Sequence, residues 1–275
     1  MSTAFGSTIL SRNNVRVQGE GPRTLVFAHG FGCDQNMWRF IEPALRERCR
    51  TVLFDYVGLG QSDRAAFDPG RYASLDGYAQ DLVEIAEALD LRDAIVVGHS
   101  VSSMIGLLAS LRAPQRFGGL AMIGPSPRYI DDPPDYVGGF QRGDIDGLLD
   151  LMDHNYVGWA GALAPMVMGQ GNRSELTAEL EETFCSTDPV VAKCFARATF
   201  YADNRADLPK AKVPSLVLQV RDDAIAPMAV GAYVERHLPG SELVVLEASG
   251  HCPHMSHPEL TLAALRPFLE RRTVA

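Results

Sequence analysis

The feature that most constrains this chain is the repeated alternation of short apolar runs with longer stretches of helical periodicity. Each run is almost continuously hydrophobic and rich in β-branched residues, which is typical of strands buried on both faces of a parallel sheet. The segment 75–89 shows the helical pattern, with its apolar side chains on one stripe. Strands that alternate with helices predict an α/β fold with helices on both faces of the sheet. The predicted strands are 24–28, 51–54, 94–97, 119–123, 215–220 and 243–246.

One long region breaks this alternation. Residues 125–208 contain no strand pattern; they open with a turn-rich stretch and continue with the pattern of three or four short helices. We therefore predict an α/β core formed by 1–124 and 209–275, with 125–208 as a helical insertion over one end of the sheet. Within it, 158–169 is apolar on all sides, which indicates burial on more than one side. This segment either packs in the core or roofs an apolar pocket.

Composition excludes several classes of partner. The formal net charge is −9, which disfavours nucleic acid or an anionic membrane as the main partner. No apolar run approaches the ~18 residues of a membrane span, and no signal peptide is evident at the N-terminus. The five cysteines form no CxxC pair, which favours a reducing compartment. We predict a cytoplasmic protein.

A candidate nucleophile, Ser100, follows the predicted strand 94–97 and precedes a helical stretch. A strand, a sharp turn that carries serine and a helix form the nucleophile elbow of G-x-S-x-G enzymes. Small residues are needed two positions before and after the serine. Gly98 meets this need, whereas Ser102 stands where the consensus has glycine. The helix N-terminus behind Ser100 would offer free backbone N–H groups to an oxyanion.

A serine hydroxyl needs a base, and histidine is the usual one. Of the seven histidines, His251 is the best candidate because it directly follows the last predicted strand. His254 and His257 lie in the same stretch, and with Cys252 they could suggest a metal site. Their spacing matches no common zinc pattern and no carboxylate stands nearby, so we predict no metal.

The base needs a carboxylate to orient it, and two adjacent candidates, Asp222 and Asp223, follow the strand 215–220. From their position alone, either aspartate could serve. The order serine, aspartate, histidine is that of the α/β-hydrolases and differs from the order in chymotrypsin and in subtilisin.

The turn after the first core strand completes the predicted site. Glycines on both sides of Phe31 let the backbone fold back toward the serine, so the amides of Phe31 and Val101 are the predicted oxyanion donors. The stretch 58–60 reads Gly-Leu-Gly but lacks the third glycine of a dinucleotide loop. We therefore predict no cofactor.

Beyond these residues, the chain resembles the α/β-hydrolase superfamily, and more narrowly the RsbQ family of bacterial stress-response regulators with the plant strigolactone and karrikin receptors. The resemblance is carried by HGFGCDQNMW, RYASLDGYAQDL, GHSVSSMIGLLAS, PSPRY, GGF and GHCPHMSHP. It places the family's serine on Ser100 and its histidine on His251, and its D-x-x-x-P pattern selects Asp223. The serine at position 102 resembles the plant branch of the family, in which the nucleophile turn reads GHSVSAM.

The resemblance also implies a four-helix lid, formed by 125–208, over an apolar cavity beside the serine. The matching positions on the cavity wall are Phe31, Phe140, Trp159, Leu163 and Phe200. Our leading hypothesis is a serine hydrolase that cleaves a small, mostly apolar ester or lactone. The alternative is a signalling protein that binds or slowly hydrolyses a hydrophobic messenger and, in the RsbQ manner, activates a PAS-containing protein phosphatase.

Overall fold

The computed structural model describes residues 8–169, 171 and 173–271, and its centre is one seven-stranded sheet. The strands lie in the order β1-β3-β2-β4-β5-β6-β7, and all neighbours are parallel except the pair β1–β3. Their bounds are β1 Arg16–Gln18, β2 Arg23–Ala28, β3 Cys49–Leu53, β4 Ala94–His99, β5 Phe117–Ile123, β6 Ser215–Asp222 and β7 Ser241–Ser249. Every strand predicted from an apolar run is present. The sequence missed β1, because three residues with two exposed side chains make no hydrophobic pattern.

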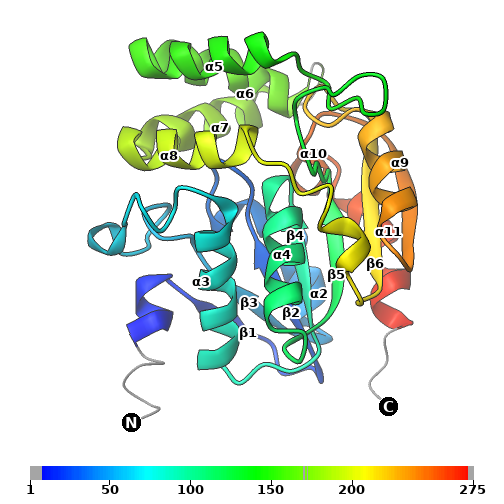
Figure 1. Cartoon of the computed structure of the whole chain (residues 1–275). Helices are drawn as coiled ribbons and strands as arrows, with labels where there is room; N and C mark the ends of the chain where they lie inside the picture. Colours follow the sequence, from blue (N-terminus) through cyan, green and yellow to red (C-terminus); the bar gives the residue numbers. More distant parts are fainter. Residues whose placement is uncertain (1–7, 170, 172, 272–275) are drawn as a thin grey trace.

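Helices cover both faces of the sheet, so the α/β architecture that the alternation predicts is confirmed. One face packs against α3, α4 and α9, and the other against α2 and α11 (Figure 1). Each face has its own buried apolar cluster, so the sheet is buried on both sides. The bounds of these helices are α2 Glu42–Arg46, α3 Leu75–Ala88, α4 Val101–Arg112, α9 Met228–His237 and α11 Pro258–Glu270; the short helices are η1 Gln35–Trp38, η2 Arg64–Ala66, η3 Leu208–Lys210 and α10 Pro253–Ser256.

Four helices follow β5 and lie above the sheet at the edge where the parallel strands end (Figure 1). They are α5 Arg142–His154, α6 Tyr156–Met168, α7 Ser174–Ser186 and α8 Pro189–Phe200. In the part of 125–208 that the structure describes there is no strand, only two isolated bridges. For the segment 158–169, which lies on α6, burial on more than one side is partly borne out: Trp159 and Leu163 are buried, whereas Met166 is 44% exposed.

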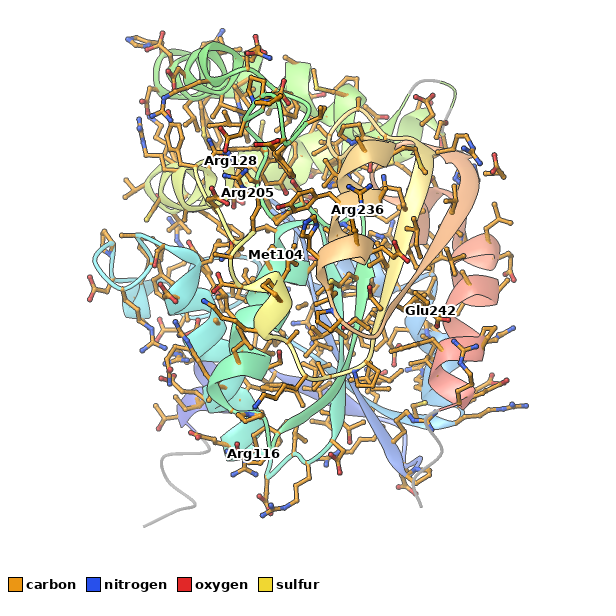
Figure 2. All side chains as sticks on the ribbon, turned by 45° about the vertical axis from the view of Figure 1, so that its right-hand side comes forward. Met104, Arg116, Arg128, Arg205, Arg236 and Glu242 are labelled. Atoms are coloured by element: carbon orange, nitrogen blue, oxygen red, sulfur yellow. The ribbon has the colours of Figure 1, made fainter. Side chains whose placement is uncertain are left out.

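Ion pairs tie the chain that enters this helical insertion to the chain that leaves it. Arg128 bonds Asp203 at 2.8 Å, and Arg205 bonds Asp203 at 2.7 Å and Asp132 at 2.8 Å. Figure 2 shows Arg128 and Arg205 together below the upper helices. The two crossings from core to insertion are thus joined to each other. None of the helices in the described ranges has the length and apolar character that a membrane crossing requires.

Candidate active site

Ser100 lies in a sharp turn between β4 and α4, at the carboxyl edge of the sheet. Its backbone has φ +56°, a left-handed conformation that is strained for a residue with a side chain and typical of functional turns. Gly98 is required here, because a Cβ at that position would lie 2.6 Å from the backbone oxygen of Ser102. The turn therefore holds the serine hydroxyl at the top of the sheet, as the elbow pattern predicts.

His251 lies in the loop after β7 and reaches the serine. Its Nε2 is 2.8 Å from Ser100 Oγ, and its Nδ1 is 2.7 Å from Asp223 Oδ2. All three side chains are buried. The backbone N–H of His251 donates to the carbonyl of Val167 on α6 at 2.7 Å, so the insertion contacts the loop that carries this histidine.

The structure separates the two adjacent aspartates. Asp223 is buried, and its Oδ1 accepts hydrogen bonds from the amides of Ile225 and Ala226 at 2.8 and 3.0 Å, which leaves Oδ2 for His251. The side chain of Asp222, the last residue of β6, is exposed. Asp223, the aspartate that the family resemblance selects, is thus the one that contacts His251.

Ser102 has a structural role that the consensus glycine cannot supply. Its hydroxyl donates to the carbonyl of His29 and shares a 2.8 Å hydrogen bond with the hydroxyl of Tyr56. His29 is buried as well, and its Nε2 accepts from the amide of Tyr56 at 3.2 Å. Ser102 and His29 therefore fix the turn after β2 against the nucleophile turn.

This turn carries Phe31, whose amide is a predicted oxyanion donor. Among the described residues, neither the Phe31 nor the Val101 amide has a hydrogen-bond acceptor. Val101 is the first residue of α4, where backbone N–H groups have no partner within the helix. Gly30 is required beside His99, because a Cβ there would lie 2.3 Å from His99 Nδ1.

Two further buried histidines support the loop of His251. His99 Nε2 lies 2.9 Å from the backbone oxygen of His251, and a neutral His99 can donate a hydrogen bond to that oxygen. The ring of His254 lies 4.6 Å from that of His99 and 4.6 Å from that of Trp38. Burial lowers the pKa of His99 well below its usual value and that of His254 to about 3, with nearby His251 adding to both effects. Both rings are therefore neutral near pH 7.

Tyr129 is a site residue that the sequence reasoning did not single out. Its hydroxyl lies 3.2 Å from Ser100 Oγ, and its ring is buried against Phe200 at 5.3 Å. Burial raises the pKa of this phenol, so it is neutral and can donate a hydrogen bond. The only sequence signal was its place in the PSPRY stretch.

A small cavity of about 30 Å³ adjoins Ser100 and His251. Of the predicted wall residues, Phe31, Leu163 and Phe200 line it. Trp159 lies behind the wall, with its ring 5.9 Å from that of Phe31, and Phe140 packs half-buried at the edge of the core. The remaining lining residues, which the sequence did not indicate, are Cys33, His99, Tyr129, Val167, Phe184, Thr199, Ile225 and Cys252.

His254 and Cys252, which the sequence places beside His251, are both buried. In the described ranges, no group of three or more histidine, cysteine or acidic side chains could hold a metal ion. His254 has no polar partner for either ring nitrogen there, and it packs against aromatic rings. Cys252 is also buried, and burial raises the pKa of its thiol well above the usual value.

A buried serine, histidine and aspartate in this order and geometry define a serine hydrolase of the α/β-hydrolase fold. Residues 25–264 match the family described as the alpha/beta hydrolase family. The chain belongs to this family.

Known proteins similar to this chain include plant receptors and esterases. "Karrikin insensitive 2 receptor IA" of Petunia hybrida is 41% identical over 91% of this chain and 92% of its own length. "Strigolactone esterase D14" of Arabidopsis thaliana is 39% identical over 96% of this chain and 97% of its own. Among solved structures, a hydrolase from Oleispira antarctica is 47% identical and superposes with a TM-score of 0.96, covering 97% of this chain and 98% of its own.

Proposed function

We propose that this protein hydrolyses a small, mostly apolar ester or lactone through an acyl-serine intermediate. The observation that carries the proposal is the continuous chain of contacts from Ser100 Oγ through the His251 ring to Asp223, at 2.8 and 2.7 Å. An apolar cavity beside the serine, and relatives named esterases at 39–40% identity, support the same conclusion.

In the first half-reaction, Ser100 Oγ attacks the substrate carbonyl while His251 Nε2 takes the hydroxyl proton. Asp223 keeps Nδ1 protonated and stabilises the imidazolium that forms. The negative charge on the carbonyl oxygen faces the amides of Phe31 and Val101, and one such donor is typically worth ~2.7–4 kcal/mol in the transition state. His251 then gives its proton to the leaving oxygen as the ester bond breaks. For a lactone, the released hydroxyl stays attached to the acyl group.

In the second half-reaction, His251 takes a proton from water, and the resulting nucleophile attacks the acyl-serine carbonyl. The carboxylic acid leaves as Ser100 recovers its proton. Tyr129 is placed to donate to Ser100 Oγ when that oxygen carries charge, since the two oxygens are 3.2 Å apart.

We further propose that residues 125–208 act as the lid and that 1–124 and 209–275 form the catalytic core. The side chains over the serine come from both parts: Leu163 and Phe200 from the insertion, and Phe31 from the core. The free space beside Ser100 is small, about 30 Å³, so we expect it to limit the length of the acyl chain that the site accepts.

Replacing the nucleophile tests the proposal. Ser100→Ala should retain the fold and lose almost all turnover of p-nitrophenyl acetate, because serine and histidine act as one unit. Ser110→Ala is the matched control: Ser110 is equally buried on α4, but its hydroxyl bonds only the Leu107 carbonyl. A Ser100→Ala variant that keeps a large part of the wild-type kcat would refute the assignment.

A second candidate function is ligand-dependent signalling, which the 41% identity to a protein named a karrikin receptor favours. In this role the same triad would bind or slowly process a hydrophobic messenger. Turnover slower than minutes, together with a ligand-dependent change in lid protection during hydrogen exchange, would support it. Fast turnover with no such change would leave hydrolysis as the whole function. The RsbQ relationship, a stress-response role, a PAS-containing phosphatase partner and a cytoplasmic location stay predictions.

A further inference from the structure

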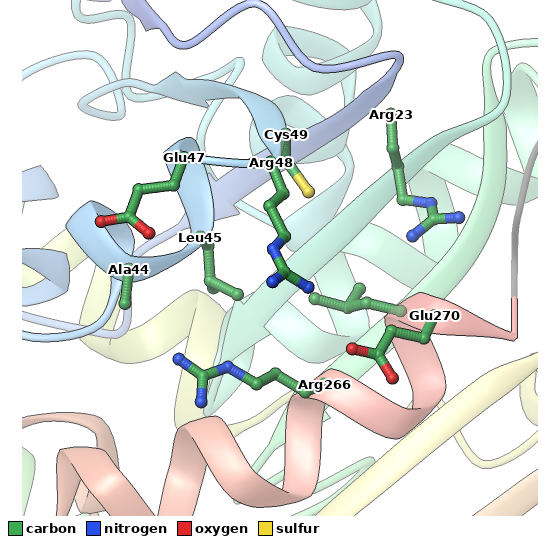
Figure 3. Close-up of a pocket in the computed structure, with 9 residues that line it drawn as sticks. Arg23, Ala44, Leu45, Glu47, Arg48, Cys49, Arg266 and Glu270 are labelled. Carbon is green, nitrogen blue, oxygen red and sulfur yellow. The ribbon is translucent and has the colours of Figure 1, made fainter.

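A second, larger cavity of about 390 Å³ lies far from the triad. It is formed where α2 and α11 meet the first residues of β2 and β3 (Figure 3). Ser100, in contrast, follows the last residue of β4, which is parallel to β2. The cavity therefore opens at the edge of the sheet opposite to the catalytic edge, and a ligand in it would not touch the triad.

Three arginines from separate segments line this cavity: Arg23 at the start of β2, Arg48 just before β3, and Arg266 on α11 (Figure 3). Among the described residues, no carboxylate oxygen lies within ion-pair distance of these three guanidinium groups. Of the arginines close to them in sequence, Arg46 bonds Gln18 and Arg271 bonds Glu242. The cavity thus gathers three guanidinium groups without ion pairs, although the chain as a whole has a net charge of −9.

The other residues that line the cavity limit the class of ligand that it can bind. Glu47 and Glu270 also line the cavity, and the carboxylate of Glu47 can accept hydrogen bonds from hydroxyl groups. Leu45 and Leu269 supply an apolar surface. The volume lies within the ~300–1,000 Å³ that small-molecule sites occupy.

We propose that this cavity binds a small phosphate monoester with a hydroxylated body, such as a sugar phosphate. A phosphate monoester presents three acceptor oxygens and a charge of about −1.5 to −2 at neutral pH. Three guanidinium forks match these oxygens better than they match the two oxygens and single charge of a carboxylate. The hydroxyl groups would donate to Glu47, and the carbon skeleton would lie against Leu45 and Leu269.

The test is calorimetric titration of the full chain with glucose 6-phosphate, glucose and inorganic phosphate, all at one ionic strength because salt screens such contacts. We expect saturable binding of one glucose 6-phosphate per chain, no binding of glucose, and at least tenfold weaker binding of inorganic phosphate. Ser100→Ala should bind glucose 6-phosphate as the wild type does, so failure of the proposed hydrolase function would leave this result unaffected.

Charge-removing variants locate the site. Arg48→Gln and Arg266→Gln should each weaken glucose 6-phosphate binding at least tenfold. Arg236→Gln is the matched control, because Arg236 (labelled in Figure 2) is an exposed arginine on α9, which packs on the face of the sheet opposite to α2 and α11. Absence of saturable binding, equal affinity for free phosphate, or an equal loss in Arg236→Gln would each overturn the proposal.

Discussion

At the scale of single residues, burial distinguishes the two adjacent aspartates and decides which of them contacts His251. Asp222 and Asp223 are neighbours, yet only Asp223 is buried, held by two amides and in contact with His251. In the sequence the two are equivalent from their position after the strand, because which aspartate turns inward is set by the loop geometry after β6. The D-x-x-x-P pattern of the resemblance was needed to choose between them.

Replacement of each aspartate by asparagine distinguishes the role of Asp223 from that of Asp222. Asp223→Asn should lower kcat on a p-nitrophenyl ester by about 10⁴-fold, because His251 would lose the partner that fixes its tautomer. Asp222→Asn should change kcat by less than about threefold, since its side chain is exposed and does not contact the triad. Steady-state kinetics of the two variants measures this, and the reverse ranking would show that the assignment is wrong.

Tyr129 shows the limit of sequence reasoning at this scale. Ser100 and His251 could be predicted because each follows a recognisable apolar strand. Tyr129 lies in the irregular stretch between β5 and α5, where no repeating apolar pattern indicates which way a side chain points. Its place 3.2 Å from the nucleophile depends on tertiary packing against Phe200, which appears only in the folded chain.

At the scale of elements, the strands and the helical insertion could be predicted, but the cavity wall could not be predicted completely. Apolar runs identify β2 to β6, because a strand buried on both faces needs them along most of its length. The edge strand β7 is mostly half-buried and is identified by the shorter run 243–246. Whether a residue lines the cavity depends instead on how the helices of the insertion are oriented and packed against one another. Trp159 is fully buried, but it packs against the rings of Phe31 and Phe184 and does not line the cavity.

Chain-length selectivity tests the lid. Each added acyl methylene should gain up to ~0.8 kcal/mol of burial until the space is full, after which overpacking costs ~1–3 kcal/mol. We expect activity on acetyl to butyryl esters and little on chains of about ten carbons or more. Leu163→Ala should move the optimum to longer chains, because Leu163 lines the cavity.

Leu149→Ala is the control for that substitution. Leu149 is as buried as Leu163 and also belongs to the lid helices, on α5, but it does not line the cavity. Both substitutions should destabilise the fold by ~2–5 kcal/mol, so only the shift in chain-length optimum distinguishes them. A flat profile through long chains, unchanged by Leu163→Ala, would mean an open groove without a closed lid.

At the scale of the whole molecule, the buried neutral histidines near the triad make the free energy of unfolding depend on pH. A histidine in an unfolded chain has a pKa near ~6.5, whereas burial lowers that of His254 to about 3. Between these values, the unfolded chain binds a proton that the folded chain does not, so falling pH favours unfolding. The contribution of His254 is fully present above pH ~6.5 and falls by up to ~5 kcal/mol toward pH 3.

Denaturant unfolding at a series of pH values measures this effect. His254→Leu should flatten the loss of unfolding free energy between pH 6 and pH 4, and His99 should account for part of the slope that remains. His154→Gln, at an exposed histidine on α5, should leave the slope unchanged. An unchanged slope in His254→Leu would show that this ring does not control acid stability.

The most direct measurement of the central claim is site-resolved labelling with a fluorophosphonate, a reagent that forms a stable bond with an activated serine. The protein should incorporate one label, on the peptide that carries Ser100, and lose p-nitrophenyl acetate turnover in proportion to labelling. Asp223→Asn should label far more slowly, because activation of the serine depends on the oriented histidine. A label on another residue, or full labelling of Ser100 with turnover intact, would contradict the account.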